Sequence, residues 1–160
     1  MRNRCSATIA KVGPFVAGMF VAVALPWPTW AELGGTVASV ENDAVRLKGT
    51  LRFTATQAYT LHEISTPTGH VAREYATADG RIFGVSWEGP TIPDLRQLLG
   101  ERYFVQFQQT AAELKRHGRG PVRIETPEFV FQQTGHMRDF HGHAYLPQSL
   151  PQGVDASAIR

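Results

Sequence analysis

The residues that could bind a metal ion are gathered in one stretch, His136-Met137-Arg138-Asp139-Phe140-His141-Gly142-His143. On a β-strand, residues two apart point to the same side, so His141, His143 and Asp139 would share one face. Two imidazoles and a carboxylate suit Zn²⁺ and similar ions. However, Arg138 adds a nearby positive charge, and no fourth ligand is marked. The stretch therefore predicts either a metal site formed by Asp139, His141 and His143 or a row of exposed polar strand residues.

A second group of side chains could form a binding surface. His62, Arg73, Tyr75 and Trp87 fall on strand-like segments that follow one another along the chain. A guanidinium among aromatic rings can hold a ligand or simply stack on the rings at a solvated fringe. The group therefore predicts a binding patch made by His62, Arg73, Tyr75 and Trp87, if the strands bring these residues to one face.

Catalytic motifs are not visible in the sequence. The serines at positions 65, 86, 149 and 157 lie in no nucleophile-elbow context, and the six histidines have no obvious carboxylate partner by sequence. No phosphate-binding glycine loop or dinucleotide fingerprint is present. We therefore expect no cofactor and favour a protein that is not an enzyme.

The strands that must position these residues meet at a turn formed by Ala78-Asp79-Gly80. A two-residue turn would place Tyr75 opposite Gly84. A three-residue loop with Gly80 as the bulge residue would instead place Tyr75 opposite Phe83 and Val71 opposite Trp87. The second register gathers the aromatic and aliphatic side chains on one face, as a half-buried sheet requires. We therefore predict the second register.

The preceding strand, within 58–65, ends at a turn over 66–69 and should run antiparallel to 71–77. Pairing Ile64 with Val71 would place His62 opposite Arg73. A last strand is predicted over 136–146, after Gly135.

One amphipathic helix is predicted from Thr91 to Lys115. Thr91 and Asp94 resemble a capping box, and Gly100 should break or kink the helix. Apolar residues recur at helical spacing: Leu95, Leu98, Leu99, Tyr103, Phe104, Phe107, Ala111 and Leu114. The predicted fold class is α+β, an antiparallel β-meander extended by flanking strands, with this helix packed on its apolar face.

Residues 1–31 have the pattern of a signal peptide. A basic start is followed by an apolar run of 14 residues from Val12 to Leu25, which is short for a membrane span. Pro26 and Pro28 end the run, and small residues precede a cleavage site after Ala31. The sequence therefore predicts a cleaved signal peptide over 1–31 and a single α+β domain over 32–160.

The domain after cleavage is nearly neutral and has no cysteine. Of 16 basic residues, Arg2, Arg4 and Lys11 lie in the signal peptide, which leaves 13 against 14 acidic residues. Because Cys5 is also removed, neither a disulfide nor a thiolate site can form. Nothing in this charge balance favours nucleic acid or an anionic membrane as a partner.

Several segments of the chain form a recognisable set: Leu33-Gly34-Gly35, the run from Tyr59 to Glu63, Arg73-Glu74-Tyr75, the run from Phe83 to Pro90, the run from Pro93 to Gly100, Gly135-His136-Met137-Arg138, and the run from Ala144 to Pro147. Together these segments resemble the proteobacterial exported family known as the domain of unknown function DUF 2844. The resemblance covers nearly all of the chain after residue 31. It implies a secreted or periplasmic single domain of a Gram-negative bacterium, with no established activity, cofactor or catalytic residue.

We therefore expect a non-enzymatic periplasmic binding or assembly module that uses the surface around His62, Arg73, Tyr75 and Trp87. The alternative is a metal-binding protein or metal-dependent hydrolase centred on His141 and His143. A periplasmic protein or a small ligand is the expected partner. Nucleic acid is not expected, nor is a stable membrane anchor once the signal peptide is cleaved.

Overall fold

The computed structural model describes residues 32–40, 44–45, 48–114 and 120–160. The predicted signal peptide and its cleavage site lie outside these residues. The strands are β1 (Thr50–Ala55), β2 (Thr60–Ser65), β3 (Val71–Ala76), β4 (Ile82–Gly89), β5 (Val122–Glu125), β6 (Val130–His136) and β7 (Asp139–Tyr145). The helix is α2 (Leu95–Glu113), with short 3₁₀ turns η1 (Val37–Ser39), η2 (Pro147–Ser149) and η3 (Ala156–Ala158).

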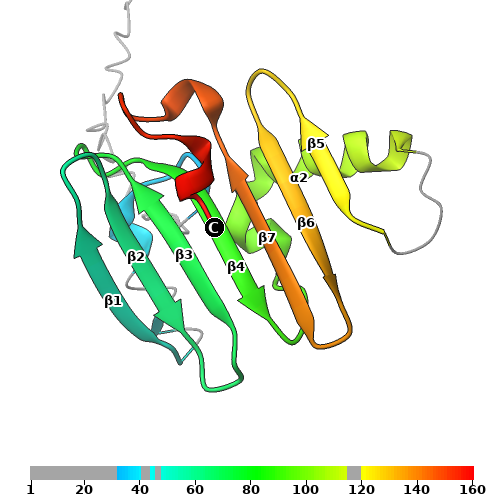
Figure 1. The fold of residues 1–160 in the computed structure, drawn as a ribbon, viewed down its shortest axis with the longest axis horizontal. Coiled ribbons are helices and arrows are strands. Elements are labelled where there is room, and N and C mark those ends of the chain that lie inside the picture. Colours follow the sequence, from blue (N-terminus) through cyan, green and yellow to red (C-terminus); the bar gives the residue numbers. More distant parts are fainter. Residues whose placement is uncertain (1–31, 41–43, 46–47, 115–119) are drawn as a thin grey trace, which may run out of the picture.

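The strands form one antiparallel sheet of seven strands in the order β1-β2-β3-β4-β7-β6-β5 (Figure 1). β2, β3 and β4 form the predicted meander, β1 extends it at the edge, and β5, β6 and β7 form a second meander. The two meanders join where β4 pairs with β7. The predicted α+β class, with a helix packed on an antiparallel sheet, is therefore confirmed.

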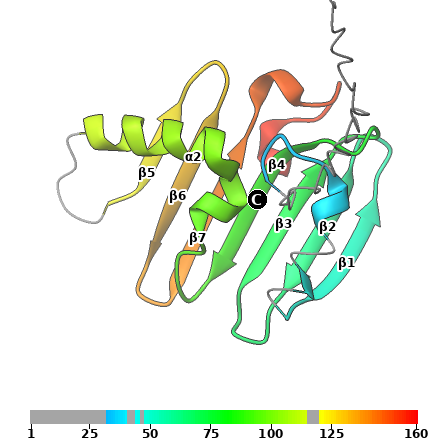
Figure 2. The ribbon, with the colours of Figure 1, turned by 180° about the vertical axis from the view of Figure 1, so that it is seen from behind.

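One side of the sheet, the helix face, is covered by α2 and by the segment around η1 (Figure 2). Leu98, Leu99 and Tyr103 of α2 pack with sheet residues that include Val85, Trp87 and Phe131. The ring centroids of Tyr103 and Phe129 are 5.4 Å apart, and those of Phe107 and Phe131 are 4.6 Å apart. The predicted aromatic stripe of the helix is therefore core.

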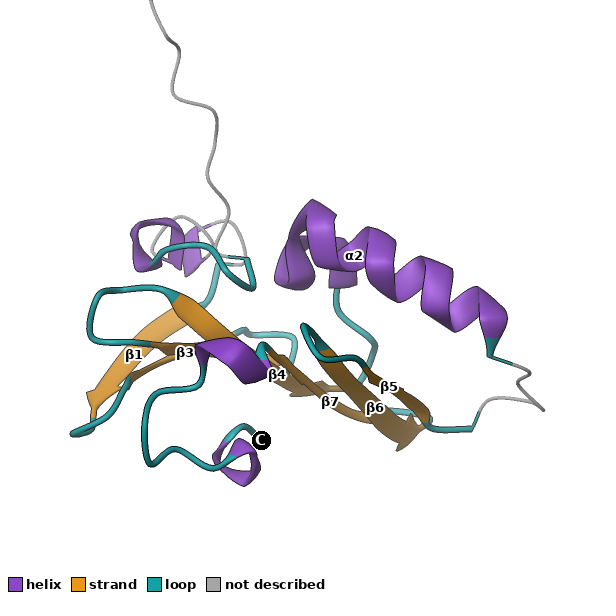
Figure 3. Cartoon of the chain, turned by 90° about the horizontal axis from the view of Figure 1, so that it is seen from above, coloured by secondary structure: helices purple, strands orange, loops and turns teal. Residues whose placement is uncertain are grey.

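The other side of the sheet, the open face, is covered only in part. The segment that contains η2 and η3 lies on this side, opposite α2 (Figure 3). Ile159 packs there with Tyr75 and Phe83 in a small second core. The rest of the open face carries polar side chains, and these form the candidate site described below.

Asp94 fixes the start of α2, because its carboxylate accepts hydrogen bonds from the backbone N–H groups of Arg96 and Gln97. The helix thus begins at Leu95 and not at the predicted Thr91. The predicted break at Gly100 is confirmed, since this residue has a φ of +72° inside the helix. Within the described residues, no helix is both long enough and apolar enough to cross a membrane.

The predicted register between β3 and β4 is wrong. Ala72 pairs with Trp87 and Tyr75 with Gly84, while Ala76 pairs with Ile82, so Phe83 is the extra residue of a β-bulge. Tyr75 and Phe83 consequently pack on the open face, whereas Trp87 packs on the helix face. Alternation could not select the register because both sides of β4 are buried from Ile82 to Trp87.

The predicted register between β2 and β3 is wrong by one residue as well. Ile64 pairs with Ala72 and Glu63 with Arg73, which leaves His62 opposite Glu74 on the helix face. The predicted last strand from His136 is also corrected, because the chain turns at Met137 and Arg138. His136 therefore ends β6 and pairs with Asp139.

Candidate functional site

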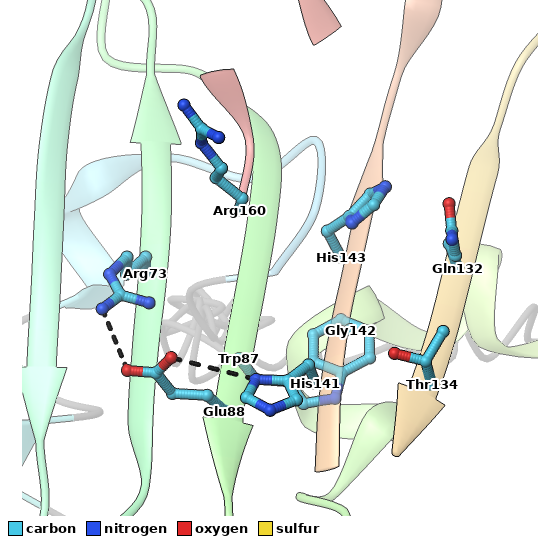
Figure 4. Close-up of a pocket in the computed structure, with 9 residues that line it drawn as sticks. All are labelled: Arg73, Trp87, Glu88, Gln132, Thr134, His141, Gly142, His143 and Arg160. Carbon is cyan, nitrogen blue, oxygen red and sulfur yellow. Dashed lines mark hydrogen bonds and ion pairs between the residues drawn. The ribbon is translucent and has the colours of Figure 1, made fainter. Parts of the chain in front are cut away.

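The open face contains a hollow of about 600 Å³ near the junction of β4 and β7 (Figure 4). Strands from both meanders contribute to it, because the pairing of β4 with β7 places them side by side. The lining residues are Arg73, Trp87, Glu88, Gln132, Thr134, His141, Gly142, His143 and Arg160. This volume falls in the range of small-molecule sites.

Arg73 forms two ion pairs at one end of the hollow. Its Nε lies 2.8 Å from Oε2 of Glu63, and its Nη2 lies 3.1 Å from Oε1 of Glu88. Partial burial works to lower the pKa of Arg73, but the hydrogen bonds and charges of Glu88 and Glu63 outweigh it and raise the pKa. The guanidinium is therefore a fixed positive charge held between two carboxylates.

His141 continues this chain of polar contacts onto β7. Its Nε2 lies 2.6 Å from Oδ1 of Asp139, where the imidazole donates to the carboxylate, and its Nδ1 lies 4.0 Å from Oε2 of Glu88. Glu63, Arg73, Glu88, His141 and Asp139 thus form one network across β2, β3, β4 and β7, which we call the charge network. Strand geometry puts His141 and Asp139 on one face, as the sequence indicated.

His143 lies on the same face, two residues further along β7. Its ring is 6.3 Å from that of Tyr145, with 23° between the ring planes. Burial lowers the pKa of His143, and the positive charge of Arg123 lowers it further. The imidazole is therefore neutral near pH 7 and can both donate and accept a hydrogen bond. No group of three or more His, Cys, Asp or Glu residues in the described part of the chain is arranged to hold a metal ion.

The structure separates the four residues of the predicted binding patch. Arg73 and Trp87 border the hollow, but the indole of Trp87 lies on the helix face, below Gly142. His62 also belongs to the helix face, where partial burial lowers its pKa. Tyr75 is buried on the open face, and its hydroxyl donates to the main-chain oxygen of Arg160 at 2.9 Å.

Gly142 explains how Trp87 borders a hollow on the opposite face. A Cβ at Gly142 would collide with the indole, so the ring fits directly beneath β7 only because position 142 has no side chain. Trp87 is 3% exposed, and within the described residues its Nε1 has no hydrogen-bond partner. The absence of a side chain at Gly142 thus lets Trp87 form the floor of the hollow.

Sequence reasoning missed Glu88, Gln132, Thr134 and Arg160 as site residues. Gln132 and Thr134 alternate with Phe131 and Gln133, which point to the helix face, but such alternation marks any half-exposed strand. Their relation to Arg73 depends on the pairing of β4 with β7, which no local pattern encodes.

The fold and the hollow define an α+β domain with a polar site on the uncovered face of a single antiparallel sheet. The chain belongs to the family described as "Protein of unknown function (DUF2844)", whose model matches residues 29–159. No curated protein and no solved structure matches the chain.

Proposed function

We propose that this protein is a non-enzymatic binding module of the periplasm and that the hollow on the open face is its ligand site. The observation that carries the proposal is the hollow itself, in which polar side chains from two meanders surround about 600 Å³. A domain that needed its sheet only for stability would gain by covering this face with apolar residues, as it does on the helix face.

The arrangement of the histidines supports binding over catalysis. Ser86 is the cross-strand neighbour of His143 on the open face, the position from which a nucleophile could meet a base. However, Ser86 Oγ is buried and makes no hydrogen bond within the described residues. His141 is already held by Asp139 at Nε2, so neither histidine activates a described serine.

Periplasmic location is part of the proposal and rests on the signal-peptide pattern of residues 1–31. N-terminal sequencing of the chain purified from the periplasm of its own host should give Glu32 as the first residue. A chain that still begins at Met1, or that is found in the cytoplasm, would contradict this part of the proposal.

The ligand can be sought by native mass spectrometry of the exported chain, purified gently from its host. We expect an added mass on the wild-type protein. Thr134→Trp should abolish it, because the indole would fill the hollow without removing a charge. Thr54→Trp is the matched control, since Thr54 is an exposed threonine of β1, at the edge of the sheet. A bare wild-type chain, or an adduct that survives Thr134→Trp, would contradict the proposal.

The same spectrum tests the alternative function. An added mass of one metal ion, lost in His141→Ala, would support a metal-binding protein or metal-dependent hydrolase instead.

A further inference from the structure

Most of the charged side chains around the hollow already have a partner, and Arg160 is the exception among the lining residues. Arg73 lies between Glu63 and Glu88, and the imidazole of His141 is bonded to Asp139. Arg123, beyond the hollow on β5, is paired with Glu125, with 2.9 Å between Nε and Oε1. A ligand with a strong charge of its own would therefore have to break an existing pair or remain unmatched.

Apart from Arg160, the lining side chains that are left for a ligand are neutral. Gln132, Thr134 and His143 make no side-chain hydrogen bond to any other described residue of the protein. They lie together, because Gln132 pairs with His143 and Thr134 with His141 across β6 and β7. An amide, a hydroxyl and a neutral imidazole each provide both donors and acceptors. Such a set complements groups that also donate and accept, which are hydroxyl groups.

One further feature extends this neutral set. The imidazole of His143, nearly parallel to the ring of Tyr145, provides a flat surface beside the free polar groups. Arg160 also lines the hollow, but it is exposed to solvent, where water screens its charge.

We propose that the hollow binds a neutral saccharide through Gln132, Thr134 and His143. This inference rests on the proposed function, because it names the ligand class of the same site. The hollow has room for a small saccharide, and its paired charges select against acidic and amino sugars. The charge network links the strands beside the ligand, while Gln132, Thr134 and His143 make the hydrogen bonds to the hydroxyl groups of the saccharide.

A glycan array carrying neutral, acidic and amino-sugar oligosaccharides can test the ligand class. The probe is the exported chain, residues 32–160, biotinylated and displayed on streptavidin so that weak single contacts add up. We expect binding to neutral glycans. Binding confined to acidic glycans would show that Arg160 dominates, and binding confined to amino sugars would show that the carboxylates do. Either result, or no binding to any glycan, would overturn the inference.

Two variants on adjacent positions locate the contact. Gln132→Ala should weaken binding to the best neutral glycan at least roughly tenfold, because it removes hydrogen bonds to hydroxyl groups. Gln133→Ala is the matched control, since it alters the next residue of β6 on the opposite face of the sheet. Circular dichroism should show both variants folded. Equal affinity of the two variants would contradict the assignment of the contact to Gln132.

Failure of this inference can be distinguished from failure of the proposed function. If no neutral glycan binds but the native mass spectrum shows an adduct that Thr134→Trp removes, the hollow is a ligand site of another class. If the adduct is also missing, the binding module itself is wrong.

Discussion

Two adjacent rows of residues cross all seven strands of the sheet and have opposite characters. The first row, on the helix face, is formed by Leu51, Ile64, Ala72, Trp87, Gly142, Gln133 and Val122. The second row, on the open face, is formed by Arg52, Glu63, Arg73, Ser86, His143, Gln132 and Arg123. Every residue of one row is the chain neighbour of a residue of the other.

The difference between the rows shows how one sheet can have an apolar face and a polar face. On the helix face, side chains gain free energy by leaving water and packing against α2. On the open face, most side chains of the row remain polar and pair with each other or stay available for hydrogen bonds. Because strand side chains alternate, one residue can pack in the core while its chain neighbour stays on the polar face.

The largest expected effect comes from comparing substitutions of two neighbouring residues of β6, one on each face of the sheet. Phe131 is fully buried between Trp87, Phe107 and Phe129, so Phe131→Ala should lower the free energy of unfolding by about 3–5 kcal/mol. Gln132→Ala, on the open face, should change it by only about 0.5 kcal/mol or less. Urea denaturation measures both. Similar decreases in the free energy of unfolding for the two variants would contradict the claim that the helix face contributes more to stability than the open face.

A smaller effect is expected where the two faces touch. In Gly142→Ala, the new Cβ would press on the indole of Trp87 and force it to shift, so unfolding should become easier by about 1–3 kcal/mol. Tryptophan fluorescence would report the displaced ring, and urea denaturation would give the loss. Gly120→Ala is the control, since a Cβ there meets no atom within 4 Å. An unchanged stability in Gly142→Ala would show that Trp87 does not depend on this glycine.

The smallest effect concerns pH and involves one histidine of each face. Because burial lowers the folded-state pKa of His143 and of His62, the unfolded chain takes up these protons more readily. The free energy of unfolding should therefore decrease as the pH falls from about 6.5 toward the folded-state pKa values. His143→Gln and His62→Gln should each make this decrease shallower in urea titrations between pH 7.5 and pH 5. A decrease as steep as in the wild type would contradict the contribution of that histidine.

Local patterns were sufficient to predict much of the fold. The alternating residues of 58–65 and 71–77, the turn at Gly80 and the helical spacing after Pro93 gave the meander and its helix. The break at Gly100 was also predicted, because a residue without a Cβ is costly inside a helix and free to adopt positive φ.

The registers could not be predicted, for an identifiable reason. Glycine and aspartate mark the turn after Ala76, but they do not show whether Phe83 is a paired residue or the extra residue of a bulge. Both assignments keep apolar residues buried, because β4 is covered on both sides by α2 and by the segment around Ile159. The four residues of the predicted binding patch were divided between the faces as a result.

By itself, the sequence determined most of the secondary structure, the α+β class and the residue types available for chemistry, because these follow from spacing along the chain. From the sequence, Arg73 and Trp87 were predicted to belong to a binding patch, and His141 and His143 to a metal site. Only the tertiary structure decided that all four border one hollow, because that depends on the pairing of β4 with β7. These two strands lie about 50 residues apart in the sequence. Their pairing depends on the burial and hydrogen bonding of the whole sheet, so no short segment of the sequence is enough to predict it.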